Sequence, residues 1–187
     1  MKRLFLLFTL VVFALCANAQ SVTKFLGIPV DGTEYAFKNK LKAKGFKTSR
    51  YATDALEGEF NGEEVFVSVQ TKSGKVWRVA VMDKVARSEV QIKIRFNNLL
   101  EQFFRNKKYF SHPENIYITD SERIGYEILI NKKQYQGAFY QKEGEVSSLE
   151  DSLSRSVWFT IGQDDYGEYR IVIFYENRLN EADGSDL

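Results

Sequence analysis

Two stretches of the chain have the spacing of an amphipathic helix, and the sequence after each has the pattern of short strands. The helical stretches are Thr33–Lys44 and Ser88–Asn106, and no further clear helix follows either of them. A helix must bury its apolar stripe against another element, and an antiparallel sheet offers such a surface. We therefore expect an α+β protein with two tandem units, each one helix followed by an antiparallel β-meander.

The second helix shows the clearer stripe. Its apolar residues recur every three or four positions: Ile92, Phe96, Leu99, Leu100 and Phe103. Its polar residues occupy the other side: Lys93, Arg95, Asn97 and Gln102. This pattern predicts a helix with one buried and one solvated face. The basic run at Arg105–Lys108 suits the negative end of a helix dipole, although it could also be a phosphate patch.

The predicted strands alternate in character along the chain. Val65, Val67 and Val69 alternate with Phe66, Ser68 and Gln70, and Trp77, Val79 and Val81 alternate with Arg78, Ala80 and Met82. Asn61-Gly62 is a strong hairpin signal because both turn positions need a positive φ angle. The expected strands are Leu56–Phe60, Glu64–Gln70, Val76–Met82, Ile116–Thr119, Ile124–Ile130, Gln134–Gln141, Arg155–Ile161 and Glu168–Tyr175.

The N-terminus is typical of a secretory signal peptide. Lys2 and Arg3 precede the apolar stretch Leu4–Leu15, and a small-x-small cleavage site follows at Ala17–Ala19. The apolar run is too short for a membrane anchor, so we expect no transmembrane segment in the mature chain. Cys16 raises a lipoprotein anchor as an alternative, but a leucine stands directly before it. We expect export to the periplasm or beyond, without a lipid anchor.

The predicted layout has four parts. Residues 1–19 are the signal peptide, 20–86 the first unit, 87–176 the second unit and 177–187 a flexible tail. The polar stretch Lys142–Ser154 interrupts the second unit, and a long connection of this kind is either functional or mobile. It is a candidate rim for a binding site.

Composition narrows the classes of function. The full chain has 26 Lys+Arg and 25 Asp+Glu. Removing the signal peptide removes Lys2 and Arg3, which leaves 24 Lys+Arg (26 minus 2) in the mature chain. A near-neutral chain is a poor partner for nucleic acid. Its single cysteine lies within the signal peptide, so the mature chain can form no disulfide and no cysteine-based metal site or nucleophile.

The remaining candidates for chemistry are weak. His112 is the only histidine, and it precedes a proline in a polar segment, which is typical of a solvated loop. Asp164-Asp165 could belong to a calcium loop, but the regular ligand spacing of an EF-hand is missing, which favours a polar hairpin. No glycine-rich phosphate loop is present. We therefore expect no catalytic residues, no cofactor and no metal.

The more suggestive set of residues follows from the strand alternation. If the aliphatic faces of the strands turn toward the helices, the opposite face carries aromatic and cationic side chains: Phe66, Arg78, Tyr140, Trp158, Arg170 and Phe174. Trp, Tyr and Arg dominate interaction hot spots. The alternative is that several of these residues form a second apolar layer, beneath the long loop or between the two units.

The sequence also resembles known proteins. Segment 25–32, with Leu41–Phe46 and Leu56–Gly62, is similar to uncharacterised secreted proteins of Bacteroidetes-type bacteria, and the signal ending Ala19-Gln20 fits these. The helix-plus-meander arrangement resembles the tandem-repeat architecture of the beta-lactamase inhibitory protein family and that of small outer-membrane assembly lipoproteins. The resemblance implies a binding sheet. It does not imply the inhibitor's own partner, because the inhibitor's disulfides have no counterpart here.

These observations give three hypotheses of function. The first is an exported, non-catalytic module that binds an envelope or secreted protein through its open sheet face. The second is a small-ligand or carbohydrate binder, for which a concave pocket lined by Trp158 and tyrosines would be evidence. The third is a hydrolase, which would need carboxylates that converge in a cleft.

Overall fold

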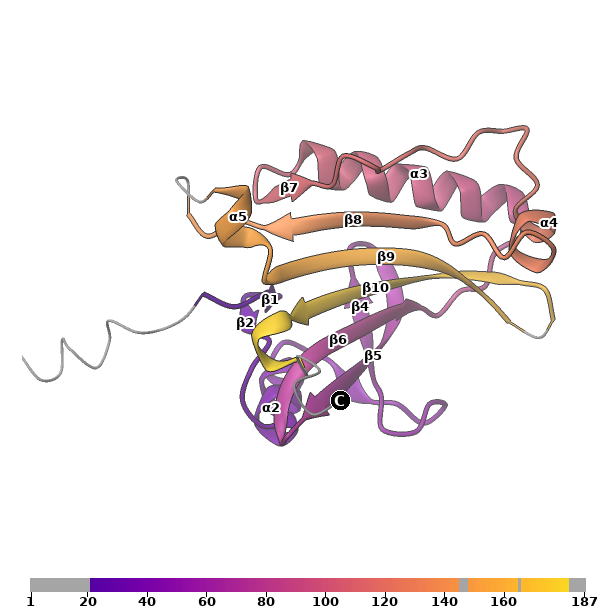
Figure 1. Cartoon of the computed structure of the whole chain (residues 1–187). Coiled ribbons are helices and arrows are strands. Elements are labelled where there is room, and N and C mark those ends of the chain that lie inside the picture. The colour runs from indigo at the N-terminus through magenta and orange to yellow at the C-terminus, as the bar shows by residue number, and fades with distance from the viewer. Residues whose placement is uncertain (1–20, 145–147, 165, 182–187) are drawn as a thin grey trace, which may run out of the picture.

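The sheet at the centre of the molecule is antiparallel throughout. The computed structural model describes residues 21–144, 148–164 and 166–181. Within them, an eight-stranded sheet has the order β3-β4-β5-β6-β10-β9-β8-β7 (Figure 1). Its strands are β3 Lys47–Thr48, β4 Leu56–Phe60, β5 Glu63–Lys72, β6 Lys75–Asp83, β7 Tyr109–Ser111, β8 Gln136–Gln141, β9 Arg155–Gln163 and β10 Tyr169–Asn177. The predicted α+β class with an antiparallel sheet is confirmed.

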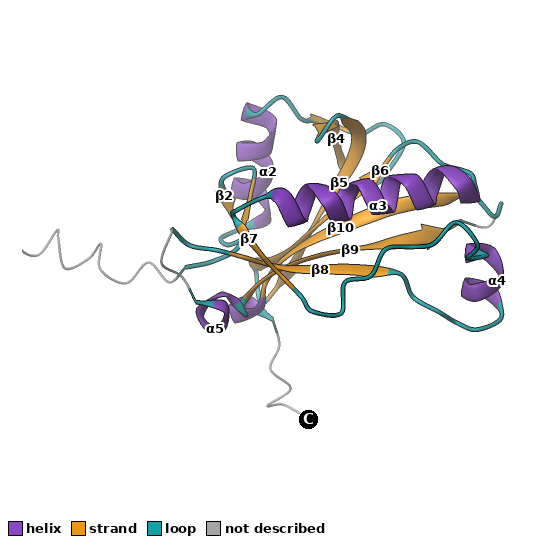
Figure 2. Cartoon of the chain, turned by 90° about the horizontal axis from the view of Figure 1, so that it is seen from above, coloured by secondary structure: helices purple, strands orange, loops and turns teal. Residues whose placement is uncertain are grey.

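The two longer helices lie on one side of this sheet. They are α2 (Glu34–Ala43), which contacts β5 and β6, and α3 (Glu89–Arg105), which contacts β10. In Figure 2, α3 lies above β8 and β9. Thr33 caps α2 by accepting a hydrogen bond from the Ala36 amide. Ser88 caps α3 through a capping box with Gln91. Both predicted helices are confirmed, and capping places their starts where the sequence predicts them.

The two groups of strands meet at one central pair. Strands β3 to β6 follow α2, strands β7 to β10 follow α3, and β6 pairs with β10 with Val81 opposite Ile173. A separate two-stranded hairpin, β1 (Lys24–Phe25) with β2 (Ile28–Pro29), precedes α2. One hydrophobic core therefore runs under both helices.

Aromatic rings fill the part of this core under α3. Phe103 stacks on Phe139 with ring centroids 4.5 Å apart, and Phe96 meets Phe159 edge to face at 5.0 Å. The side chains of Phe96, Phe139 and Phe159 are at most 1% exposed. Aromatic pairs of this kind contribute about 0.5–1.5 kcal/mol each beyond the area that they bury. The core thus compensates for the missing disulfides.

The hairpin predicted at Asn61-Gly62 is confirmed. Asn61 and Gly62 have φ angles of 53° and 76°, which is the combination that a two-residue turn between right-twisted strands needs. Ser73 and Gly74 repeat the arrangement between β5 and β6, with φ angles of 50° and 77°. Both turns fix the register of the first strands.

Two predicted strands are wrong. Residues 124–130 contain α4 (Ile124–Leu129), because the carboxylate of Glu89 accepts hydrogen bonds from the amides of Ile124 and Gly125 at the start of that helix. Segment 116–119 is not a strand because the Asn97 side chain bonds both backbone groups of Ile118, at 2.8 and 2.9 Å. In both cases a side chain that is distant in the sequence forms the hydrogen bonds that the backbone would otherwise form with a neighbouring strand.

Some elements were not expected from the sequence. The short edge strands β3 and β7 were missed, and the connection at 142–154 contains the one-turn helix α5 (Leu149–Ser152). Arg95, predicted on the solvated side of α3, is instead only 9% exposed because it pairs with buried Asp83.

The start of the expected flexible tail is anchored. Residues Arg178–Asn180 form a 3-10 helix, η1. Asn177 donates to the carbonyl of Val30 at 2.9 Å, and Asn180 donates to Asp31 and to the carbonyl of Val76 at 2.8 and 2.9 Å. Residues 182–187, like the expected signal peptide and Cys16, lie outside the described residues.

Candidate functional site

All six residues selected from the strand alternation lie on the same face of the sheet, which we call the open face. The register shows this, because paired residues point to the same side. Phe174 pairs with Ala80 on β6 and with Trp158 on β9. The remaining pairs link the rest of the set: Arg78 with Glu176, Phe66 with Met82, Tyr140 with Ser156, and Arg170 with Gly162. The opposite face carries the core under α2 and α3.

Four side chains form a continuous row across the middle of the open face. The rings of Trp158 and Phe174 stack with centroids 4.2 Å apart and an angle of 24° between the planes. The guanidinium carbon of Arg78 lies 5.2 Å from the Phe174 ring centroid and 4.0 Å from that of Trp77. We call Trp77, Arg78, Phe174 and Trp158 the aromatic–arginine row. It spans β6, β10 and β9.

Trp77 joins the row because of a bulge. It was expected on the aliphatic face with Val79, but the pairing of β5 with β6 shifts between Gln70 and Thr71, so that these residues oppose Arg78 and Val76. Trp77 is the extra residue, and a bulge redirects its side chain. Alternation along a single strand cannot reveal this.

The other three predicted residues lie around the row rather than in it. Phe66 is covered by the ammonium of Lys84, 5.3 Å from the ring centroid. Tyr140 lies near His112, with ring centroids 6.3 Å apart. Arg170 forms a salt bridge of 2.6 Å with Asp164. These residues form the periphery of the open face.

Charges on the open face are largely paired. Arg78 lies 2.6 Å from the carboxylate of Glu176, whose side chain is only 4% exposed. The Nε atom of Arg78 has no hydrogen-bond partner among the described residues. The hydrogen bond from Arg170 lowers the pKa of Asp164, and two backbone amides strengthen the effect. The face therefore combines aromatic area with charges that are already paired, and the unpaired Nε atom of Arg78 is itself buried.

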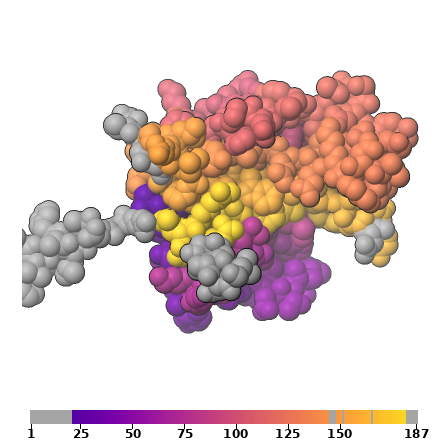
Figure 3. Space-filling model, in the orientation of Figure 1, coloured from indigo at the N-terminus to yellow at the C-terminus, as the bar shows by residue number. Residues whose placement is uncertain are grey.

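The open face is partly exposed. None of the six side chains is among the buried residues, and α2 and α3 both lie on the opposite side. Figure 3, drawn from the side of the open face, shows atoms of β9, β10 and β6 at the surface. All six residues are intermediate in exposure, neither fully buried nor fully exposed.

Two residues considered for catalysis or metal binding have structural partners. The ring of His112 accepts a hydrogen bond from the Glu114 amide at 3.3 Å. The carboxylate of Asp164 accepts hydrogen bonds from the backbone amides of Tyr166 and Glu168, an arrangement that is typical of a turn. Asp165 lies outside the described residues. In the part of the chain that the structure describes, no three His, Cys, Asp or Glu side chains are placed to hold a metal ion.

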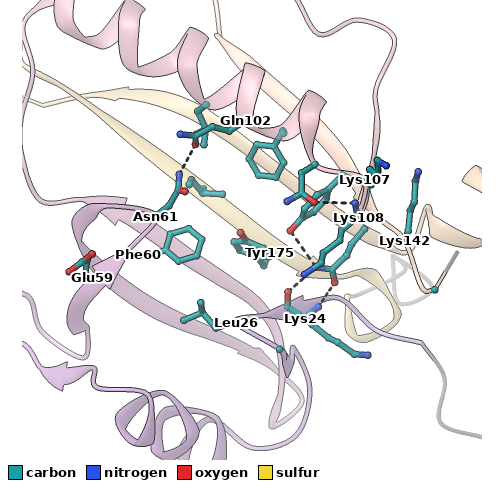
Figure 4. Close-up of a pocket in the computed structure, with 18 residues that line it drawn as sticks. Lys24, Leu26, Glu59, Phe60, Asn61, Gln102, Lys107, Lys108, Lys142 and Tyr175 are labelled. Atoms are coloured by element: carbon teal, nitrogen blue, oxygen red, sulfur yellow. Dashed lines mark hydrogen bonds between the residues drawn. The ribbon is translucent and has the colours of Figure 1, made fainter.

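A second candidate site lies on the helix side of the sheet. It is a groove of about 1160 Å³ between the C-terminal half of α3, the β4–β5 hairpin and the β1–β2 turn (Figure 4). Ile173 and Tyr175 of β10 form part of its floor, and Lys107 and Lys108 contribute to its rim. The sequence does not reveal this groove, because its walls come from segments far apart in the chain; the basic run Arg105–Lys108 is the one local signal near it.

The functional assignment of this protein rests on the geometry of its structure. Searches against protein-family models, curated proteins and solved structures found no match to the chain. Of the helices in the described ranges, none combines the length and apolar character that crossing a membrane requires.

Proposed function

We propose that the protein is an exported, non-catalytic binding module that docks a protein partner on the open face of its sheet. The observation that carries the proposal is the aromatic–arginine row, which lies on the side of the sheet opposite α2 and α3. Partly exposed Trp and Arg side chains in contact with one another are typical of hot spots at protein interfaces.

The chemistry of the open face indicates the kind of epitope that fits. Arg78 and Arg170 are already paired with acidic side chains, so the face offers little net charge for an oppositely charged partner. The stacked rings of Trp158 and Phe174 offer apolar area. A protein epitope with an apolar centre and a few hydrogen-bonding groups for Arg78 complements this surface.

A protein partner is favoured over a sugar or other small ligand on this face. Small-molecule sites are concave and surround most of the ligand. The row instead extends over three neighbouring strands, and the residues that line the large groove do not include Trp158.

We also propose that the two halves are tandem repeats of one helix with an antiparallel meander, as in the beta-lactamase inhibitory protein family. The supporting observation is the order of elements. Each of α2 and α3 is followed by four strands of the sheet, and the last strands of the two groups, β6 and β10, pair at the centre. The open face would then extend across both repeats.

A differential capture experiment tests the docking proposal. Wild-type protein and the Trp158→Ala variant are immobilised and exposed to an envelope extract of the source organism, and recovered proteins are quantified by mass spectrometry. Each candidate is then purified and titrated directly. Removing a central aromatic anchor costs about 2 kcal/mol or more, so we expect the Kd to rise by roughly thirtyfold.

The matched control is Tyr51→Ala, because Tyr51 is 82% exposed and lies outside both candidate sites. A genuine partner binds wild type and this control equally. If every purified partner binds the Trp158→Ala and Phe174→Ala variants as tightly as wild type, the open face is not the docking surface.

A further inference from the structure

The groove on the helix side of the sheet has two walls held together by hydrogen bonds. The side chain of Asn61, in the β4–β5 turn, donates to the Gln102 side chain of α3 at 2.7 Å. At the other wall, the backbone of Lys24 exchanges two hydrogen bonds with the Gln141 side chain, at 2.7 and 3.1 Å. These bonds join the β4–β5 turn and strand β1 to the second half of the chain, so the groove is part of the folded structure.

The inner surface of the groove combines apolar side chains with polar ones. Ile173 and Tyr175 lie on its floor, Phe103 faces it from α3, and Phe60 and Leu26 face it from the first half. Leu26 is 37% exposed, whereas Ile173 and Tyr175 are at most 5% exposed. The volume of about 1160 Å³ is enough for a ligand of ordinary size.

The rim of the groove is strongly cationic. Among the described residues that line it, the basic ones are Lys24, Lys107, Lys108 and Lys142 and the acidic one is Glu59, which gives these residues a formal net charge of +3. Figure 4 shows the lysines on one side of the groove and Glu59 on the other. This asymmetry separates a cationic end from an apolar one.

The positive charges are largely uncompensated. Within the described chain, none of the four lysines forms a salt bridge with an acidic side chain. The ammonium of Lys142 is the exception in direction: it lies 4.2 Å from the ring centroid of Phe110, which pairs with Tyr140 of the open face, so it points away from the groove.

A helix end alone does not explain this cluster. Lysines after α3 complement the partial negative charge of its C-terminus, but that charge is about half a unit. Lys24 comes from another segment, β1, and raises the charge beyond it. Three cations from two segments, next to apolar side chains, are complementary to a ligand that has both an anionic group and an apolar body.

We propose that the groove binds an anionic amphiphile, with a carboxylate or phosphate head at the lysine side and its hydrocarbon chain along Phe60, Leu26 and Ile173. This site is separate from the open face and does not depend on the docking proposal. The head group can belong to a free fatty acid or to a membrane lipid, because both present the same chemistry to the lysines.

Calorimetric titration of the full mature chain tests the proposal with defined probes below their micelle concentrations. We expect dodecanoate and dodecyl phosphate to bind. We expect dodecyl maltoside, which has the same chain and an uncharged head, and acetate or inorganic phosphate, which have no chain, to bind at least about tenfold more weakly. Equal binding of dodecyl maltoside would overturn the role of the lysines.

Paired variants locate the site. Lys24→Gln/Lys108→Gln removes two rim charges, and we expect it to raise the Kd for dodecanoate by about tenfold, with a smaller effect at high salt. The control Lys40→Gln/Lys42→Gln removes two exposed charges from α2 and leaves the Kd unchanged. Unaltered binding by the rim variant would overturn the proposal.

A further pair probes the apolar wall. Leu26→Glu places a carboxylate where the chain would lie, and Leu129→Glu adds the same charge at an exposed site on α4. We expect only the first to weaken dodecanoate binding, by about tenfold or more. Urea unfolding of each variant separates loss of binding from loss of folding.

The remaining arms identify the source of the ligand. Co-sedimentation with phosphatidylglycerol vesicles, lost in the rim variant, indicates a membrane lipid. Binding of monomeric dodecanoate without co-sedimentation indicates a free amphiphile. If hexaglutamate competes fully with dodecanoate and binds as tightly, the site accepts acidic peptides, and the amphiphile proposal is wrong.

Discussion

The carboxylate of Asp83, in the last position of β6, lies 3.1 Å from the Nε atom of Arg95 in α3, and both side chains are buried. Arg87 lies 2.8 Å from the same carboxylate and 2.7 Å from that of Glu63 on β5. This ion-pair cluster connects the helix over the second half of the chain to strands of the first half.

Removing the centre of this cluster is expected to destabilise the fold strongly. Asp83→Ala leaves buried Arg95 without its main partner, and breaking a buried pair in this way costs about 3–5 kcal/mol. Urea unfolding followed by circular dichroism measures the loss. Glu34→Ala is the control, because the pair of Glu34 with Lys38 is partly exposed and contributes about 0.5 kcal/mol or less. Similar losses for both variants would contradict this account.

Two glycines in strands are expected to differ in how much stability the protein loses when each is replaced by alanine. A Cβ atom at Gly137 would lie 2.5 Å from the ring of Phe159, whereas one at Gly162 would lie 3.8 Å from Val172. We expect Gly137→Ala to cost about 1–3 kcal/mol of unfolding free energy, because the core must shift. Gly162→Ala should change it by less than about 0.5 kcal/mol. The two variants act as controls for each other in thermal unfolding.

The sequence predicts the parts of the fold that depend on local patterns. Apolar spacing and caps locate α2 and α3, positive φ angles locate the turn at Asn61, and strand alternation places Trp158 and Phe174 on the same face. Each of these signals lies within a few residues of the element that it specifies, so no knowledge of distant contacts is required.

The parts that the sequence does not predict depend on distant contacts. The strand-like residues at Ile124 form a helix because Glu89 caps it from another element. Trp77 reaches the open face only through the mismatch between β5 and β6. The groove escaped prediction for the same reason, because Lys24 and Lys108 come together only when the chain folds.

The buried tyrosine of the groove floor predicts how stability depends on pH. Burial raises the pKa of Tyr175 well above its ordinary value, so the folded protein keeps the phenol proton where the unfolded chain has lost it. The contribution of this group is therefore complete below about pH 10 and is lost as pH rises further, by up to about 1.4 kcal/mol per pH unit.

Urea unfolding between about pH 8 and pH 11.5 measures this slope. Tyr175→Phe should make it shallower above about pH 10, even though it lowers stability at neutral pH through the lost hydrogen bond with Tyr109. Tyr51→Phe, at an exposed site, should leave the slope as in wild type. A Tyr175→Phe slope equal to that of wild type would contradict the prediction.

Two neighbouring residues of β9 provide the last test, because they point to opposite faces of the sheet. Phe159 is 0% exposed and packs against Phe96 and Phe139, so Phe159→Ala should cost about 3–5 kcal/mol. Trp158 is half-buried and stacks on one ring, Phe174, so Trp158→Ala should cost only about 1–2 kcal/mol despite the larger deletion. Chemical denaturation of both variants measures the difference. If Trp158→Ala proves as costly as Phe159→Ala, the open face is covered in the native protein, and the docking surface proposed for it does not exist.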